Sequence, residues 1–302
     1  MRMKKVVVTG SSGFVGLNFK KYLFTNFAND IIPFARESWN DISNCNFEKN
    51  TAIVHLAGKA HDLKKVSKPD EYYIVNTELT KKIYERFLKS ESETFIFLSS
   101  VKAAADTSDT TIFEDILPHP ITDYGKSKAQ AEQYILQNIP IDKKVFILRP
   151  TMIHGTGNKG NLNLLYKVVK NKVPWPLGAF DNKRSFCTVE NLCFIICELI
   201  QRNDIPSGIY NVCDDIPLST NQIIRMISKS QNRKPIFINL PKKIVQKLAS
   251  IGDKFSLPLN SERLQKLTEN FVVSNSKILK AINKKLPFTS EEGLIKTLKS
   301  FD

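Results

Sequence analysis

Three glycines, Gly10, Gly13 and Gly16, follow the first apolar run of the chain and open a helical pattern. A dinucleotide pyrophosphate is bound by backbone N–H groups at a helix N-terminus, and positions without a side chain let the backbone come close. The alternative is a tight turn that binds nothing, because the spacing is G-x-x-G-x-x-G rather than G-x-G-x-x-G. Since this turn joins an expected strand to an expected helix, we favour dinucleotide binding.

Arg36 bears on which dinucleotide binds. About 20 residues after such a turn, an acidic residue would hold the ribose 2′-hydroxyl of NAD, but this chain has Arg36 at the end of its second expected strand. A guanidinium can pair with the 2′-phosphate of NADP. The expected cofactor is therefore NADP(H) or NAD(H), with NADP(H) preferred unless Arg36 simply faces water.

Tyr124 and Lys128 could carry out proton transfer. They begin a helical pattern, and side chains four residues apart share one helix face. An ammonium beside a phenol favours the phenolate, so we expect Lys128 to lower the pKa of Tyr124 from its unperturbed value of about 10. Such a phenol can exchange a proton with a sugar hydroxyl while hydride moves to or from nicotinamide.

Position has to support that spacing, because Tyr166 and Lys170 repeat it. Ser100 follows an expected strand directly, at the carboxyl edge where ligands bind to open parallel sheets, and its hydroxyl could bond the reacting oxygen. The 24 residues from Ser100 to Tyr124 allow a loop that returns to the same edge. Tyr166 lies in an apolar helical pattern without such a partner, and we interpret it as structural.

The elements that must position these residues alternate along the first half. Short continuous β-rich runs predict strands buried on both faces, at 5–9, 31–34, 52–56, 94–98 and 144–148. Helical spacing occupies 14–27, 70–89 and 124–138. The alternation predicts an α/β fold, a Rossmann-type doubly wound parallel sheet with right-handed crossovers.

Composition agrees with a large folded unit. The chain has 302 residues, 42% of them hydrophobic. We expect a dinucleotide-binding domain at 1–160 and a smaller α/β substrate-binding region at 161–302, interleaved with the last sheet elements. Histidines 55 and 154 lie far apart without an adjacent ligand pattern, so we expect structural or cofactor-lining roles and no metal site.

Charge and cysteine usage bear on partners and compartment. The formal charge is +14, but lysines are spread along the chain, and we interpret them as a solvated surface without a nucleic-acid partner. The odd set of five cysteines has no C-x-x-C pair, which is typical of a reducing, cytoplasmic compartment. No apolar run approaches the roughly 20 residues needed to cross a bilayer, so we expect no stable membrane insertion.

One basic segment has two interpretations. Apolar residues at helical spacing, Ile244, Val245, Leu248 and Ile251, stand among lysines. Such a helix could lie on a membrane surface. We expect instead a helix of the smaller domain that faces the core, which is the commoner cause of this spacing.

Taken together, these residues resemble the extended short-chain dehydrogenase/reductase family, the nucleotide-sugar epimerases, dehydratases and reductases. The likeness runs through most of the chain. The motifs that carry it are Thr9-Gly10 to Gly16, His55-Leu56-Ala57-Gly58, Val75-Asn76, Leu98-Ser99-Ser100, Tyr124 to Lys128, Arg149-Pro150, Gly155-Thr156-Gly157, Lys159-Gly160-Asn161, Pro176-Leu177-Gly178, Arg184-Ser185-Phe186 and Tyr210-Asn211-Val212.

The resemblance implies roles for individual residues. It implies a Ser100-Tyr124-Lys128 catalytic triad and a nucleotide-sugar substrate whose diphosphate is held by Asn161 and Arg184, with help from Arg263. It places Asp41 and Ala57 near the adenine half of the cofactor. The cofactor-binding residues matching its motifs are Gly10, Gly13, Phe14, Val15, Gly16, Ala57, Gly58, Asn76, Tyr124 and Lys128. By analogy, a homodimer is among the assemblies open to this chain.

The resemblance also narrows the reaction. Sugar 4,6-dehydratases of the family carry an Asp-Glu acid/base pair after the catalytic serine, whereas this chain has Val101-Lys102, so dehydration is not expected. The chain looks most like a bacterial branch of UDP-sugar 4-epimerases and 4-keto-reductases of surface-polysaccharide synthesis. Both reactions stay open. So does a non-catalytic dinucleotide-binding sensor or nucleic-acid-binding relative of the same fold.

Overall fold

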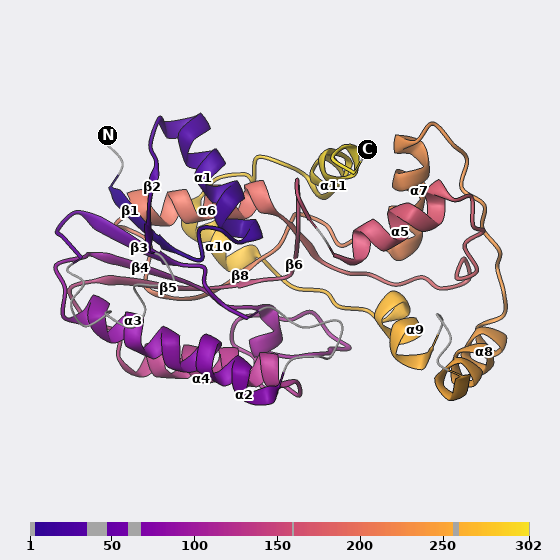
Figure 1. Cartoon of the computed structure of the whole chain (residues 1–302), viewed down its shortest axis with the longest axis horizontal. Coiled ribbons are helices and arrows are strands. Elements are labelled where there is room, and N and C mark those ends of the chain that lie inside the picture. The colour runs from indigo at the N-terminus through magenta and orange to yellow at the C-terminus, as the bar shows by residue number, and fades with distance from the viewer. Residues whose placement is uncertain (1–3, 35–46, 60–67, 159, 256–259, 302) are drawn as a thin grey trace.

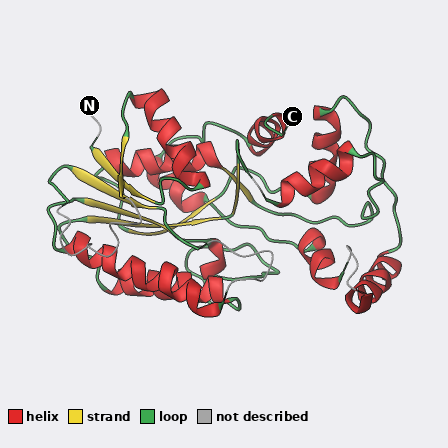
Figure 2. Ribbon diagram, in the orientation of Figure 1, coloured by secondary structure: helices red, strands yellow, loops and turns green. Residues whose placement is uncertain are grey.

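A computed structural model of the chain describes residues 4–34, 47–59, 68–158, 160–255 and 260–301. Six of the described strands form one parallel sheet in the order β2-β1-β3-β4-β5-β8 (Figures 1 and 2). Their bounds are β1 Lys5–Thr9, β2 Ile31–Phe34, β3 Thr51–His55, β4 Thr94–Leu98, β5 Lys144–Pro150 and β8 Gly208–Val212. The expected α/β fold with a doubly wound parallel sheet is confirmed.

The strand order creates a crevice between β1 and β3. The chain leaves β1 for β2 on one side and later leaves β3 for β4 on the other, so the winding direction reverses at this pair. Ligands of doubly wound sheets bind outside the carboxyl ends of the strands at such a switch point. Here that point lies between the segment after Thr9 and the segment after His55. Thr9 and His55 are direct partners in the sheet.

Helices cover both faces of the sheet (Figure 1), and alternate side chains of each strand point to opposite faces. Val6 and Val8 point into a core formed with α1 Phe14–Phe27, α6 Val189–Gln201 and α10 Ser276–Ile282. Val7 and Ile53 point into the opposite core, against α3 Leu79–Leu88 and α4 Asp123–Gln137. Because β3 and β4 are buried along their whole length, they read as continuous apolar runs.

The expected helix at 70–89 is divided into three pieces. It runs through α2 Pro69–Tyr72, the π-helix η3 Tyr73–Glu78 and α3. π-Helical turns often mark functional sites, and this one carries Asn76. The amide of Asn76 is buried and hydrogen-bonds the backbone of Lys59 and the hydroxyl of Ser127. Contacts from other parts of the chain therefore hold the altered turn.

The smaller part of the molecule lies beyond the carboxyl edge of the sheet (Figure 1). It contains α5 Asn161–Lys170, α7 Thr220–Ser230, α8 Lys242–Phe255, α9 Ser261–Thr268 and α11 Ser290–Lys299. A short parallel pair, β6 Met152–His154 and β7 Phe186–Thr188, joins it to the sheet. The boundary at residue 160 stays a prediction, and the later elements α6 and β8 lie with the sheet.

Helix α8 corrects the expectation that its apolar residues face the core. Val245 is buried, but Ile244, Leu248 and Ile251 are 48%, 47% and 47% exposed. The buried face is completed by the small residues Ala249 and Gly252, which let the helix pack closely on its neighbours. Within the described ranges, the structure contains no helix with the length and apolarity needed to span a bilayer.

Candidate functional site

The glycine turn brings the ends of β1 and β3 into contact. Gly10 has φ +68°, and a Cβ atom there would lie 2.6 Å from the backbone nitrogen of Ala57. A Cβ on Gly16 would lie 2.4 Å from the carbonyl oxygen of Gly10. Both distances are shorter than atoms tolerate, so a side chain at Gly10 would push the ends of β1 and β3 apart, and one at Gly16 would push α1 away from the glycine turn. The hydroxyl of Thr9 accepts a hydrogen bond from the Ala57 nitrogen at 3.1 Å and fixes the same approach.

The N-terminus of α1 opens from this turn. Its N-cap is Gly13, which has no side chain to occupy the helix end, and the first turn carries no acidic residue. The first N–H groups of an α-helix have no partner within the helix, and here they belong to Phe14, Val15 and Gly16. Together with the helix dipole, they fit a pyrophosphate group.

The segment after β3 meets the start of α4. A Cβ on Gly58 would lie 3.0 Å from the Nζ atom of Lys128 and 3.1 Å from the Oδ1 atom of Asn76. Gly58, Asn76 and Lys128 are therefore neighbours at the carboxyl edge, beside the switch point. The sequence assigned all three to cofactor binding, and that assignment stays a prediction.

Tyr124 and Ser100 come together at the same edge. Thr122 caps α4 by accepting a hydrogen bond from the backbone nitrogen of Gly125 at 3.2 Å, which sets the first turn that carries Tyr124. Ser100 precedes the short 3-10 helix η4 Val101–Ala103 after β4. Its hydroxyl and the phenol of Tyr124 form a hydrogen bond. The rings of Tyr124 and Tyr72 also pack edge to face, with centroids 6.2 Å apart.

The direction of the Tyr124 pKa shift is opposite to the one expected. Burial raises the pKa of the phenol, the hydrogen bond with Ser100 lowers it by less, and the neighbouring Tyr72 adds to the rise. Spacing alone suggested that the Lys128 ammonium would dominate. Instead that ammonium donates to the carbonyl oxygen of Leu98 at 2.9 Å and lies 4.7 Å from the ring centroid of Phe97.

Burial makes the charged form of Lys128 unfavourable. The residue is only 4% exposed. Burial lowers the pKa of its ammonium to about 8, and Glu132 offsets part of that change. The Lys128 charge in turn contributes to the low pKa of the buried imidazole of His55, about 3, for which burial is the larger cause. His55 is therefore neutral, and its ring bonds the hydroxyls of Thr9 and Thr80 at 2.6 and 2.9 Å.

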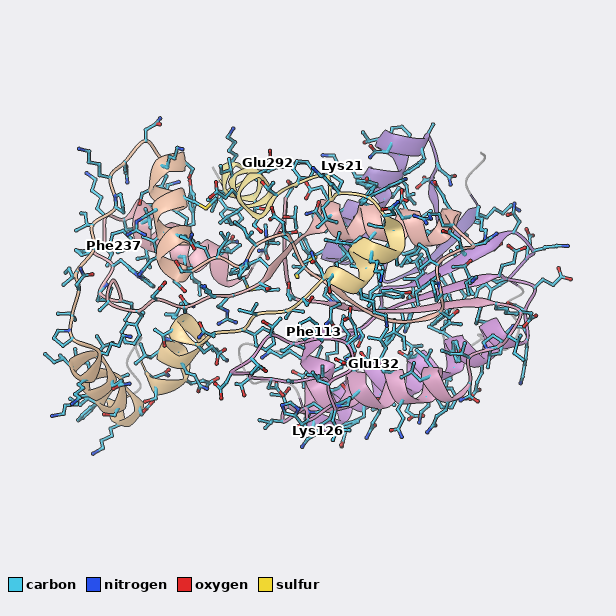
Figure 3. The ribbon with its side chains drawn as sticks, turned by 180° about the vertical axis from the view of Figure 1, so that it is seen from behind. Lys21, Phe113, Lys126, Glu132, Phe237 and Glu292 are labelled. Atoms are coloured by element: carbon cyan, nitrogen blue, oxygen red, sulfur yellow. The ribbon has the colours of Figure 1, made fainter. Side chains whose placement is uncertain are left out.

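Glu132 supports the site from behind, and sequence reasoning missed it. Its carboxylate pairs with Arg149, whose Nη2 atom is 2.6 Å away, and accepts a hydrogen bond from the hydroxyl of Ser99. Glu132 and Arg149 are 2% and 1% exposed. Figure 3 labels Glu132 on the sheet side of α4 and Lys126 on its outer side. The signal was available, because Tyr124, Lys128 and Glu132 repeat at intervals of four on one helix face.

Lys102 and Arg184 form a second cationic group near Ser100. Arg184 pairs with Glu269 at 3.4 Å and forms backbone bridges to Leu218 and Phe271. The Lys102 ammonium lies 4.7 Å from the ring centroid of Phe271. Burial lowers the pKa of both cations, and Arg184 also contributes to the lowering at Lys102. The two cations are close enough to interact electrostatically. They lie where the smaller part joins the sheet.

Lys102 is also tied to the start of α4. Its Nζ atom lies 3.7 Å from the carboxylate of Asp106. That carboxylate accepts hydrogen bonds from the backbone nitrogens of Ile121 and Thr122 at 2.7 and 3.0 Å and from the Thr122 hydroxyl. The residue that caps the Tyr124 helix is therefore held by the same carboxylate that contacts Lys102. Sequence spacing does not reveal this link.

The remaining predicted residues are not all brought to this edge. Arg36 and Asp41 fall outside the described residues. Asn161 begins α5, and the description does not include its side chain. Arg263 lies exposed in the first turn of α9, where its backbone nitrogen bonds the capping residue Asn260.

The sequence analysis also singled out His154 and Tyr166, and both lie in the interior of the protein. His154 is buried, with its ring bonded to Thr297 at 2.9 Å and 3.6 Å from Asp214. Tyr166 packs in a core with Leu162 and Phe186. Across the described ranges, no three His, Cys, Asp or Glu residues gather in a group that could hold a metal ion.

Comparison with known proteins identifies the family. A family model described as the NAD dependent epimerase/dehydratase family matches residues 6–213. The chain is 28% identical to a UDP-glucose 4-epimerase from Vibrio cholerae over 319 residues, covering 99% of this chain and 95% of that protein. It is 30% identical over 193 residues to an N-acetyl-alpha-D-glucosaminyl-diphospho-ditrans,octacis-undecaprenol 4-epimerase from Escherichia coli O157:H7, covering 63% and 57%.

The fold also has close structural counterparts. A UDP-glucuronic acid 4-epimerase variant from Bacillus cereus, solved with UDP-4-deoxy-4-fluoro-glucuronic acid and NAD, superposes with a TM-score of 0.76 at 17% identity, over 98% of each chain. The resemblance to extended short-chain dehydrogenases and the expectation of a nicotinamide dinucleotide cofactor are confirmed. Because the family model spans more than half of its length, this chain belongs to the NAD-dependent epimerase/dehydratase family.

Proposed function

We propose that this protein acts at C4 of a UDP-(N-acetyl)hexose, as a 4-epimerase or a 4-keto-reductase. The observation that carries the proposal is the hydrogen bond between Ser100 and Tyr124 at the carboxyl edge, with the buried Lys128 on the same face of α4 as Tyr124. A nicotinamide dinucleotide, when bound, supplies the hydride acceptor or donor. Proton transfer then falls to the side chains of this chain.

The residues present fit the dinucleotide. A Cβ on Gly10 would clash with Ala57 across the crevice, and one on Gly16 would clash with the glycine turn itself. The helix end offers the backbone nitrogens of Phe14 and Val15 to the pyrophosphate. Ala57, at the end of β3, would line the adenine half. Gly58 and Asn76 would line the nicotinamide half, because both lie against Lys128. Arg36 keeps our preference for NADP(H) and, with it, a slight preference for reduction.

Tyr124 would exchange a proton with the oxygen on C4. Its raised pKa means that the phenol carries its proton at neutral pH, which suits donation to a 4-keto oxygen. Both candidate reactions contain that step. Ser100 would hydrogen-bond the same oxygen and hold it in place. The nearby ammonium of Lys128 would favour the phenolate once the proton has moved.

Arg184 would bind the diphosphate of the substrate, and Lys102 adds a second cation beside it. We keep Asn161 and Arg263 as further contacts to the diphosphate, as the resemblance implies. We also keep the exclusion of 4,6-dehydration. Val101 is 3% exposed and apolar, and the Lys102 ammonium is engaged with Asp106. Neither can donate a proton to a leaving hydroxyl in the manner of a carboxylic acid.

A second candidate differs in the carrier of the sugar. The relative from Escherichia coli is named for a sugar diphosphate linked to undecaprenol, and a diphosphate site would accept either carrier. The exposed apolar residues of α8 favour this candidate, because a lipid-linked substrate is reached at a membrane. Comparing kcat/KM for one sugar on UDP and on a polyprenyl diphosphate separates the two.

A panel of UDP-sugars with both cofactors tests the main proposal. A UDP-4-keto-6-deoxy-N-acetylhexose with NADPH should lose the NADPH absorbance if the protein is a reductase. A UDP-hexose should change at C4 without net redox change if it is an epimerase. Tyr124→Phe should remove turnover while cofactor affinity stays nearly unchanged. Dinucleotide binding with no turnover of any sugar diphosphate would instead support the non-catalytic sensor.

A further inference from the structure

Helix α8 has two faces that its own fold does not use. Its buried face consists of Val245, Ala249 and Gly252. The first two pack in a core with residues from three other segments: Trp175 and Leu177 of one loop, Ile224 of α7 and Leu264 of α9. This packing attaches α8 to the rest of the smaller part, so the remaining faces are not needed for that attachment.

The first unused face is an apolar stripe, which we define as Ile244, Leu248, Ile251 and Phe255. These side chains are 48%, 47%, 47% and 71% exposed. Their intervals of four, three and four residues place them in one line along the helix. Soluble proteins expose single apolar side chains routinely, but an aligned set of large ones marks an interaction surface.

The second unused face is a lysine band, which we define as Lys243, Lys247 and Lys254. All three are exposed. With about 100° between successive residues, the band runs next to the stripe, on the side away from the buried face. The single acidic residue of α8, Asp253, points elsewhere and accepts two hydrogen bonds from Ser261 at 3.0 and 2.6 Å. No carboxylate of the helix therefore interrupts the band.

We propose that α8 docks this protein on an anionic lipid surface. A helix with an apolar stripe beside a cationic band lies in the plane of a bilayer, with the stripe among the acyl chains and the lysines near the headgroups. At about 1.5 Å per residue, fourteen residues are too short to span the roughly 30 Å hydrocarbon core. The helix therefore lies on the membrane.

The position and charge of α8 favour a bilayer over a second copy of the chain. The helix lies at the end of the molecule farthest from the sheet, where it can meet a flat surface (Figure 1). Each copy carries a formal charge of +14, so pairing two copies through this helix would bring like charges together. Four side chains also offer far less than the roughly 800 Å² per partner that a stable interface buries.

Vesicle binding by the full chain tests the proposal. Vesicles of phosphatidylcholine with 30 mol% phosphatidylglycerol are compared with pure phosphatidylcholine vesicles by flotation. The wild-type protein should float with the anionic vesicles and stay behind with the neutral ones. Changing the stripe residues to serine should abolish flotation. At about 1 kcal/mol for each lysine near an anionic surface, Lys243→Gln, Lys247→Gln and Lys254→Gln together should weaken binding by roughly 100-fold.

Matched controls lie on exposed positions outside α8. Phe24→Ser with Ile141→Ser removes two apolar side chains that are more exposed than Ile244, Leu248 and Ile251 of the stripe. Changing three exposed lysines outside α8 to glutamine, Lys82, Lys89 and Lys299, removes the same charge as the band variant. Both controls should float like the wild type. Circular dichroism of each variant establishes that it is folded.

Several results would overturn the proposal. One is flotation of the stripe variant equal to the wild type, and another is a failure of the wild type to bind anionic vesicles. If the wild type sediments as a dimer that the stripe variant makes monomeric, the stripe is a contact between copies. These readouts need no sugar substrate or cofactor. Failure of docking and failure of the proposed reaction are therefore distinguishable.

Discussion

Replacing Lys128 by methionine should make the protein more stable than the wild type at neutral pH. This advantage should disappear at high pH. Burial lowers the pKa of this ammonium from an ordinary 10.5 to about 8. At about 1.4 kcal/mol per pH unit, the charged form is destabilised by roughly 3 kcal/mol in the folded protein. Methionine has a similar length and no charge, so it removes this cost. It also removes the hydrogen bond to the Leu98 carbonyl, a loss of about 1 kcal/mol.

The pH dependence gives the sharper test. Between pH 8 and 10.5 the unfolded chain binds a proton at Lys128 that the folded chain has released, so the stability of the wild type rises with pH across this window. The methionine variant has no such gain. The difference in unfolding free energy between variant and wild type should therefore move by roughly 3 kcal/mol in favour of the wild type from pH 7 to pH 10.5.

Urea denaturation at a series of pH values measures this difference. Lys126→Met is the matched control, because Lys126 lies exposed on the outer side of the same helix (Figure 3). Its difference from the wild type should stay constant with pH. A constant difference for Lys128→Met as well would refute the reasoning, since it would mean that the buried ammonium carries no charge cost. Turnover should be lost in this variant, so a gain in stability would accompany a loss of function.

Three further changes test the site. Glu132→Gln leaves the buried Arg149 without its carboxylate partner and should lower the free energy of unfolding by about 3–5 kcal/mol. Tm should fall by at least about 6 °C, whereas the control Glu48→Gln, in an exposed ion pair, should leave Tm unchanged. Gly10→Ala should weaken cofactor binding, measured by calorimetry, at least tenfold more than Gly157→Ala does. Gly157 is the control because it also has a positive φ, +85°, but a Cβ there would have nothing within 4 Å to clash with. Arg184→Gln should weaken UDP binding by roughly 10–100-fold and leave the Kd for NADPH unchanged.

Much of the fold could be predicted from the sequence because its central strands are buried on both faces. Such strands read as continuous apolar runs, and the expected strands at 5–9 and 94–98 have the bounds of β1 and β4. The expected strand at 31–34 has the bounds of β2, although β2 is an edge strand with two exposed residues. Helix α1 also has its expected bounds, since the glycine turn fixes its start. The division of 70–89 was not visible, because the π-helix depends on bonds from Asn76 to residues distant in sequence.

The site was predictable as a set of positions but not as an electrostatic environment. Spacing found Tyr124 and Lys128, and the strand end found Ser100. The direction of the Tyr124 pKa depends on burial, which a spacing of four residues does not reveal. The exposure of the α8 stripe was missed for a related reason, because helical periodicity does not say which of two apolar faces meets the core.

The path of the chain through α6 and β8 limits how this molecule can be divided. The polypeptide leaves the sheet after β5, builds part of the smaller region, returns as α6 and β8, and leaves again. A fragment ending at residue 160 would uncover Val6, Val8 and Leu148, whose core α6 completes. Several backbone crossings, rather than one linker, would have to bend together if the crevice opens and closes. Fused or truncated versions of the protein should therefore keep the whole chain, because it forms one folding unit.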